Sequence, residues 1–150
     1  MPEIYEIATG FRVAIEEAVR SGEIKEMGTF PRGCCSYASD LLQRYLREQY
    51  GFFTWYMSGE YGHGCDAESH AWLETQDGMV IDITGDQYKY KNLRFTEPVY
   101  VGTRNNGFHD KFQLHKPLAY SFVDDPFGQN KADCRYEAVM KHIRKEQSIK

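Results

Sequence analysis

The stretch that decides the fold is residues 69–84, which read SHAWLETQDGMVIDIT. Two runs of β-forming residues, 69–74 and 79–84, flank the pair Asp77-Gly78, and an Asp-Gly pair between such runs is typical of a β-hairpin. Alternate side chains of a strand point to opposite faces of its sheet. With Asp77 at the centre of the turn, one face of the hairpin is apolar and consists of Ala71, Leu73, Ile81 and Ile83.

The opposite face of the same hairpin carries His70 and Asp82 as diagonal neighbours. The Cα atoms of a diagonal pair are about 7–8 Å apart, which is close enough for the two side chains to hydrogen-bond. A register shifted by one partner would place them directly opposite each other. In both arrangements the carboxylate can bind one imidazole nitrogen and fix the tautomer of the ring.

Upstream of the hairpin, residues 30–36 read FPRGCCS and lead into a predicted helix. The first N–H groups of a helix lack partners and its dipole favours an anion, so a thiolate there has a lowered pKa. The same helix start offers a backbone N–H to an oxyanion. A thiol at a helix start, a histidine on a strand and an aspartate beside it match the nucleophile, base and orienting group of covalent catalysis.

Around these motifs the apolar pattern predicts further helices and strands. The predicted helices span about 3–21, from Cys34 or Cys35 to Gly51, and about 131–146. The predicted strands outside the hairpin span 52–57 and 98–101, with a short one near 120–123, and residues 59–64 are expected to form a loop. This order predicts an α+β fold with helices packed on an antiparallel sheet.

The composition describes an ordinary globular chain. Its 150 residues fit one domain, 1–150, with one hydrophobic core. Eighteen Lys and Arg against 22 Asp and Glu give a formal net charge of −4, so the basic surface that sequence-independent nucleic-acid binding needs is not expected. The apolar runs are far shorter than the ~20 residues of a membrane helix, and the N-terminus does not resemble a signal peptide. We therefore expect a cytoplasmic protein with neither nucleic-acid nor membrane partners.

The chain has four cysteines: Cys34, Cys35, Cys65 and Cys134. They form no CxxC pair, which argues against a zinc ribbon, and adjacent cysteines bridge each other only under strain. Free thiols are therefore expected, and one of them can serve as a nucleophile. No cofactor or metal is predicted. The alternative is a metal site in which His63 and Cys65 join Cys34, Cys35 and His70.

Three motifs carry a family resemblance: GCCSYAS at 33–39, SHAWLE at 69–74 and IDIT at 81–84. They resemble the transglutaminase-like branch of the papain-like cysteine enzymes, which has Cys at a helix start, His in a HAW strand and Asp in a DxT strand. Within that branch, FPRGCC at 30–35 and DITGDQY at 82–88 are similar to small bacterial proteins of unassigned activity. The resemblance covers about residues 30–88. It implies a papain-like core with the nucleophile helix packed on the sheet.

The double cysteine leaves two candidates for the nucleophile. The pattern of the small bacterial proteins puts it on Cys35, whereas the broader transglutaminase-like pattern often has Ala four residues after the Cys, which fits Cys34 and Ala38. Cys35 is our prediction, because its Gly-x-Cys spacing fits both patterns.

The resemblance implies a cysteine-dependent hydrolase or acyltransferase that acts on an amide or other acyl bond of a peptide or protein. Cys35 would attack the carbonyl, His70 would accept and return the proton, and Asp82 would orient His70. The Cys35 backbone N–H would form part of the oxyanion hole, whose second donor the sequence does not assign. The alternative is a non-catalytic domain of the same fold that binds a peptide or partner protein.

Other residues near these motifs are given different roles. Glu74 and Asp86 are alternative orienting groups for His70. Trp72, on the His70 face of the hairpin, is expected to be mostly core and could shield the site from water. His109 and His115 lie in a polar, loop-rich stretch and are expected at the surface.

Overall fold

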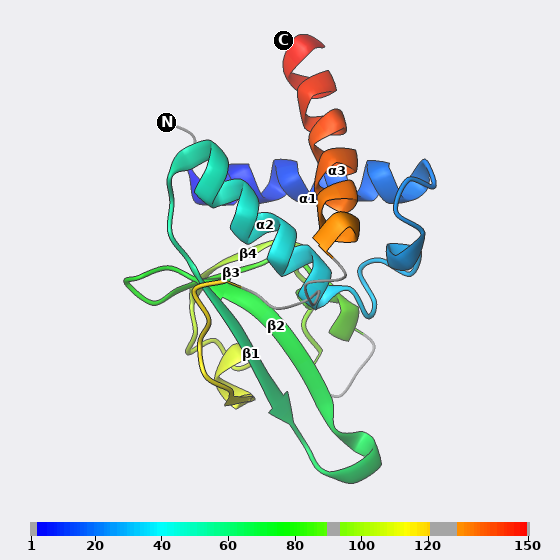
Figure 1. The fold of residues 1–150 in the computed structure, drawn as a ribbon. Helices are drawn as coiled ribbons and strands as arrows, with labels where there is room; N and C mark the ends of the chain where they lie inside the picture. The colour runs from blue at the N-terminus through cyan, green and yellow to red at the C-terminus, as the bar shows by residue number, and fades with distance from the viewer. Residues whose placement is uncertain (1–2, 90–93, 121–128, 150) are drawn as a thin grey trace.

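The computed structural model describes residues 3–89, 94–120 and 129–149. In this part of the chain three α-helices pack on a five-stranded antiparallel sheet, which confirms the α+β class (Figure 1). The helices are α1 (Ile4–Arg20), α2 (Cys35–Tyr50) and α3 (Gln129–Ile149). The strands are β1 (Trp55–Tyr61), β2 (Glu68–Glu74), β3 (Met79–Asp82), β4 (Tyr100–Thr103) and β5 (Gln113–Leu114). Among the helices so described, none is long and apolar enough to cross a membrane.

In the described residues, four short 3-10 helices connect these elements: η1 (Lys25–Met27), η2 (Gly64–Asp66), η3 (Gly85–Tyr88) and η4 (His109–Lys111). The strand order in the sheet is β4-β3-β2-β1-β5, so the hairpin strand β2 is central.

The hairpin has the predicted register. Leu73 pairs with Ile81 and Glu74 with Val80, which places Asp77 at the centre of the turn. Strand β3 ends at Asp82, two residues before the predicted end, because the chain turns there into η3. The Asp82 carboxylate accepts a hydrogen bond from the Thr84 N–H at 2.9 Å, which stabilises this turn.

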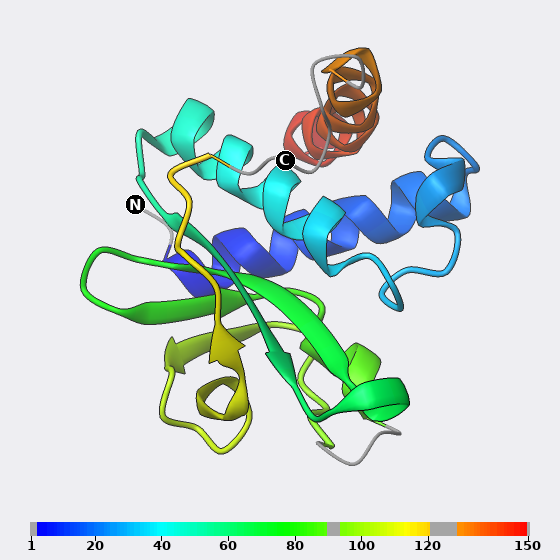
Figure 2. The same ribbon diagram turned by 60° about the horizontal axis from the view of Figure 1, so that its bottom comes forward.

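The two faces of the sheet are covered differently. All three helices lie on one side, with α2 packed on β2 and β1, and α1 packed on α3 (Figure 2). The apolar hairpin face (Ala71, Leu73, Ile81 and Ile83) is buried in the core between helices and sheet. On the other side, the segment that contains η4 folds back under the sheet (Figure 2). It completes a second cluster that consists of Met57, Trp72, Val80, Tyr88, Phe108 and Phe112.

The observed bounds of β1 differ from the predicted ones, because distant segments pair with this strand. Strand β1 starts later than predicted and runs to Tyr61, through part of the predicted loop, because it pairs with both β2 and β5. Gly59 permits this close pairing, since a Cβ atom there would lie 2.8 Å from the Gln113 carbonyl oxygen. The helices predicted over 3–21 and 131–146 are confirmed. Of the strand expected near 120–123, residues 121–123 lie outside the described residues.

Candidate active site

The candidate site begins at the N-terminus of α2. Cys34 is the residue that precedes the helix and Cys35 is its first residue. Gly33 has a φ of +71°, in the left-handed region that favours glycine, and turns the chain into the helix. Cys34 is buried in the core between the helices and the sheet, and its thiol lies 3.4 Å from the Arg32 carbonyl oxygen, whereas Cys35 is partly exposed.

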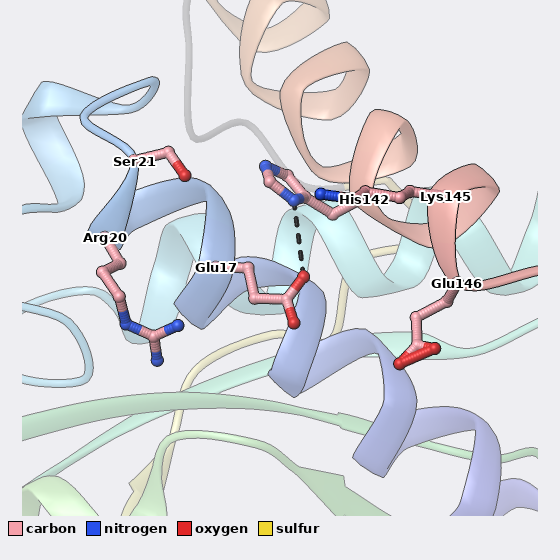
Figure 3. Close-up of a pocket in the computed structure, with 6 residues that line it drawn as sticks. All are labelled: Glu17, Arg20, Ser21, His142, Lys145 and Glu146. Carbon is pink, nitrogen blue, oxygen red and sulfur yellow. Dashed lines mark ion pairs between the residues drawn. The ribbon is translucent and has the colours of Figure 1, made fainter. Parts of the chain in front are cut away.

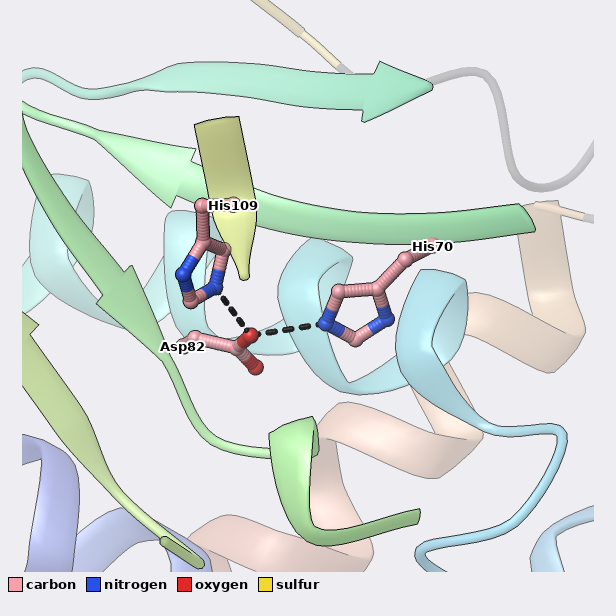
Figure 4. Close-up of side chains that lie close together, drawn as sticks. All are labelled: His70, Asp82 and His109. Carbon is pink, nitrogen blue, oxygen red and sulfur yellow. Dashed lines mark hydrogen bonds and ion pairs between the residues drawn. The ribbon is translucent and has the colours of Figure 1, made fainter. Parts of the chain in front are cut away.

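His70 and Asp82 meet on the polar face of the hairpin, as the strand parity predicts. Nε2 of His70 lies 2.7 Å from Oδ2 of Asp82, and both side chains are buried (Figure 4). The same imidazole also acts on the Cys35 thiol, whose pKa its hydrogen bonding and charge lower. Because Asp82 occupies Nε2, Nδ1 is the ring nitrogen left for the thiol. His70 therefore interacts both with Asp82, by a hydrogen bond, and with Cys35, whose pKa it lowers.

The charged forms of Cys35, His70 and Asp82 stabilise one another. Burial by itself disfavours the Cys35 thiolate, but the hydrogen bond and charge of His70, with the backbone N–H of Ala71, lower the pKa of Cys35 overall. Burial likewise disfavours the His70 cation, yet the charge and hydrogen bond of Asp82, together with Cys35, raise the pKa of His70 to about 9. Burial also opposes the Asp82 carboxylate, but the charge of His70 and the hydrogen bond of His109 hold its pKa well below the usual range. A thiolate–imidazolium pair is the consistent reading of these directions.

His109 is a member of the cluster that sequence reasoning missed. The prediction that it lies at the surface is wrong: the side chain is buried, and its Nε2 lies 2.7 Å from Oδ2 of Asp82, the oxygen that His70 also contacts (Figure 4). Its position in a polar loop gave no signal of burial, although Phe108 and Phe112 on either side are both core residues. His115, in contrast, is exposed as predicted.

Asn106 determines which nitrogen of His109 carries the hydrogen. The side-chain oxygen of Asn106 accepts hydrogen bonds from the N–H groups of Phe108 and His109, at 2.8 and 2.9 Å. Its amide nitrogen must therefore be the group that faces Nδ1 of His109, at 2.8 Å. Nδ1 is then an acceptor, so the hydrogen of the neutral ring lies on Nε2 and is donated to Asp82.

His70, Asp82 and His109 also have the residue types of a metal site. Among the described residues, these three side chains form a group of candidate metal ligands, because their ligand atoms all lie within 4.8 Å of one another. A metal on Nε2 of His109 would require the hydrogen on Nδ1, where it would face the amide N–H of Asn106. Hydrogen bonding to Asp82 therefore fits this cluster better than metal binding does.

The structure does not bring together the alternative set of metal ligands that the sequence suggests. His63 and Cys65 lie exposed in the connection between β1 and β2, and neither belongs to the group of ligand atoms just described.

The alternative orienting groups bind other partners. Glu74 accepts a hydrogen bond from the Trp72 indole at 3.0 Å and forms a two-contact ion pair with Arg104. Asp86 forms an ion pair with Arg12, with contacts of 2.7 and 2.9 Å. Asp82 is thus the carboxylate hydrogen-bonded to His70.

Four aromatic side chains surround the imidazole of His70. The ring centroids of Trp72, Tyr88, Phe108 and Phe112 all lie between 5.0 and 5.9 Å from that of His70. Trp72 is fully buried, which confirms its placement in the core beside His70. This apolar shell keeps water from the His70–Asp82 hydrogen bond and so strengthens it.

A separate pocket of about 270 Å³ lies between α1 and the end of α3 (Figure 3). It is lined by Glu17, Arg20, Ser21, His142, Lys145 and Glu146. His142 is already engaged there, 3.4 Å from a Glu17 oxygen and 2.8 Å from a Glu23 oxygen. None of the lining residues belongs to the cluster around Cys35.

Comparisons of the chain with models of known protein families, with curated proteins and with solved structures find no match.

Proposed function

We propose that this protein is a cysteine-dependent hydrolase or acyltransferase with a papain-like core of the transglutaminase-like type. The observation that carries the proposal is the buried His70–Asp82 hydrogen bond of 2.7 Å, next to a thiol at the start of α2 whose pKa His70 lowers. The three residues come from the start of a helix and from one face of a central hairpin, and their charges favour a reactive thiolate.

In the proposed reaction the Cys35 sulfur attacks the carbonyl carbon of a peptide or protein amide and forms a carbon–sulfur bond. The proton that left the thiol is held on Nδ1 of His70 and passes to the leaving nitrogen as the carbon–nitrogen bond breaks. Water then releases the acyl group in a hydrolase, and an amine does so in an acyltransferase. Asp82 stabilises the His70 cation throughout.

His109 and Asn106 extend this arrangement by one layer. Asp82 accepts hydrogen bonds from two histidines and from the Thr84 N–H, so its carboxylate has no freedom to rotate away from His70. We assign His109 as a positioning residue, because it acts on the thiol only through Asp82 and His70.

The test is the rate at which iodoacetamide alkylates each cysteine, read by tandem mass spectrometry at about pH 6. An ordinary thiol, with a pKa of about 8.5, is almost wholly protonated there. We expect Cys35 to react before Cys65 and Cys134, although both of these are exposed. We also expect His70→Ala to abolish this preference.

Alkylation of Cys35 that is slower than that of the exposed thiols, and unaffected by His70→Ala, would contradict the proposal. That result would favour a non-catalytic domain that binds a peptide or partner protein.

A further inference from the structure

A second concave region lies apart from the cluster around Cys35, where α1 meets the ends of α2 and α3. It is a groove of about 510 Å³, a volume within the range of small-molecule sites. Figure 1 shows α3 crossing α1 at a steep angle, so the two helices diverge on either side of their contact. The groove, which we call the α1–α3 groove, has an apolar floor with Ile7, Phe11 and Ile143.

Gly10, in the middle of α1, lines this groove and keeps it open. A glycine inside a helix makes that helix less stable than an alanine does. At this position neither the backbone nor a neighbour requires glycine, because its φ is not positive and an added Cβ atom would meet no neighbouring side chain within 4 Å. The missing side chain therefore leaves space in the groove that a larger residue would fill, with no gain to the fold.

Aromatic rings form one wall of the α1–α3 groove. Tyr45 stacks on Phe11 with the ring centroids 4.7 Å apart, and Tyr50 meets Tyr45 edge to face at 5.7 Å. Tyr50 is only partly buried, and both tyrosines line the groove. The faces of such rings carry negative potential and attract cations as well as apolar groups. This wall therefore suits a ligand that is apolar, positively charged or both.

The charged side chains at the groove favour a cation. Glu6, Glu17 and Glu146 line it, and its lining within the described residues contains no Lys or Arg. Glu17 lies 3.4 Å from His142, but Glu6 and Glu146 have no ion-pair partner in the part of the chain that the structure describes. Glu146 also lies in the last turn of α3, which contains no basic residue and where the helix dipole is negative. A positive group in the groove thus has two carboxylates available to it.

The neighbouring polar pocket has a different charge pattern. It shares Glu17, His142 and Glu146 with the groove, but Arg20 and Lys145 also line it (Figure 3). These two cations disfavour a further positive charge in the polar pocket. The better place for a cation is therefore the α1–α3 groove.

We infer that the α1–α3 groove binds an organic cation with an apolar body, of the arylalkylammonium class. The aromatic part of the ligand packs on Tyr45 and Tyr50. Its ammonium group lies near Glu6 or Glu146. The volume of the groove, its aromatic wall and its charge favour this class over an anion or a neutral polar molecule. The inference goes beyond the proposed function and does not depend on it, because the groove shares no residue with the cluster around Cys35.

The probe is tryptamine, an arylalkylammonium ion at neutral pH, and its neutral control is tryptophol, which carries a hydroxyl in place of the ammonium group. Isothermal titration calorimetry on the full chain at low salt gives the dissociation constants, and the amide signal of Gly10 in heteronuclear NMR spectra locates the binding. We expect tryptamine to bind about tenfold more tightly than tryptophol, because cation–π contacts and partly exposed ion pairs each contribute modestly. The double variant Glu6→Gln with Glu146→Gln should lose most of this difference.

Gly10→Leu tests the groove itself, since the leucine side chain would occupy the space that glycine leaves. We expect the affinity for tryptamine to fall at least about tenfold, whereas the thermal unfolding temperature should not fall, because leucine favours a helix. Thr9→Leu is the matched control. It places the same side chain one residue earlier on α1, outside the lining of the groove, and should bind tryptamine as the unmodified protein does.

Three results would each overturn the inference: no binding of tryptamine, equal affinities for tryptamine and tryptophol, or binding that survives Gly10→Leu. None of these measurements reads the reactivity of Cys35, so their outcome is distinct from that of the proposed function.

Discussion

Cys34 and Cys35 are adjacent in the chain and both lie at the start of α2, yet their surroundings are opposite. Cys34 is buried in the core between the helices and the sheet, and burial raises the pKa of its thiol. His70 acts on Cys35 and lowers the pKa of its thiol despite burial. Because the two residues share the helix start, its dipole does not separate them. The two cysteines differ because a histidine from another part of the chain lowers the pKa of one thiol, whereas burial raises the pKa of the other.

The largest expected effect comes from replacing Cys34 and Cys35 one at a time. Cys35→Ser should remove alkylation at about pH 6 and acylation by p-nitrophenyl acetate, because the nucleophilic sulfur is lost. Cys34→Ala should retain both, since the Cys34 thiol has no histidine partner among its hydrogen bonds. Loss of reactivity in Cys34→Ala with retention in Cys35→Ser would exchange the roles of the two cysteines.

The next effect concerns Asp82, which hydrogen-bonds to His70, the histidine partner of Cys35. Asp82→Asn should lower the alkylation rate of Cys35 by about 10²-fold, because the asparagine amide favours the wrong His70 tautomer and leaves its cation without a counter-charge. We expect less than the ~10⁴-fold loss of the serine-protease analogue, since a thiolate–imidazolium pair is partly preformed. Alkylation kinetics on the purified variant give the rate, and its thermal unfolding shows whether the variant is folded at the assay temperature.

Glu74→Gln is the matched control for Asp82→Asn. Glu74 is a buried carboxylate on the same strand pair but bonds to Trp72 and Arg104. If Glu74→Gln impairs alkylation and Asp82→Asn does not, the orienting group is misassigned.

The pH dependence should sharpen the comparison between Cys35 and the exposed Cys65. A thiol loses about tenfold in thiolate per pH unit below its pKa, so the lowered pKa of Cys35 makes its thiolate fraction fall less steeply over the same range. The ratio of the Cys35 rate to the Cys65 rate should therefore rise as the pH falls from about 8 to about 6. A constant ratio over this range would show that the Cys35 thiol is not activated.

His70 adds a second feature to the same profile. Its pKa is raised in the folded state to about 9, so its cation persists above the ordinary value of 6.5 and is lost as the pH rises through about 9. The stabilisation that this cation contributes to the folded state is complete below about pH 6.5, and it is lost as the pH rises from there through about 9. We expect the Cys35 profile to change slope near that pH, and to lose this feature in Asp82→Asn.

A smaller effect is expected one layer further from the thiol. His109→Ala leaves Asp82 with one fewer hydrogen bond. We expect it to slow Cys35 alkylation by about tenfold, which corresponds to part of the free energy of a hydrogen bond to a charged group. His109→Gln should recover much of the rate, because its amide can donate to Asp82 again. Equal rates in the alanine variant and the unmodified protein would remove His109 from the site.

The smallest expected effect belongs to Cys34. Cys34→Ala removes one buried atom from the core and should lower the free energy of unfolding by about 1 kcal/mol, measured by urea denaturation. The alkylation rate of Cys35 should stay unchanged. A change in that rate would mean that the two cysteines are coupled.

Several parts of this molecule follow from local sequence pattern. The Asp77-Gly78 turn and the alternation of side chains predict the hairpin register, and that register places His70 and Asp82 on one face. Gly51 ends α2 in the left-handed conformation, at φ +60°, as its position after the apolar stripe predicts. These features depend on neighbours within a few residues or on a single short turn, so the printed sequence is enough to predict them.

Other features depend on segments that the sequence does not relate to one another. Strand β5 exists because it pairs with Gly59 and Glu60, and the polar run that contains it carries no strand pattern of its own. The burial of His109 and the approach of Gln87 to His70 likewise bring together residues from distant turns.

By itself, the sequence determined the α+β class, the helix that begins at the cysteines and the hairpin face that pairs a histidine with an aspartate. Only the tertiary structure decided which cysteine meets that histidine and that a second histidine shares the aspartate. The physical reason is that side-chain alternation and turn geometry act over a few residues. The pKa of a thiol depends instead on contacts between segments that only folding brings together.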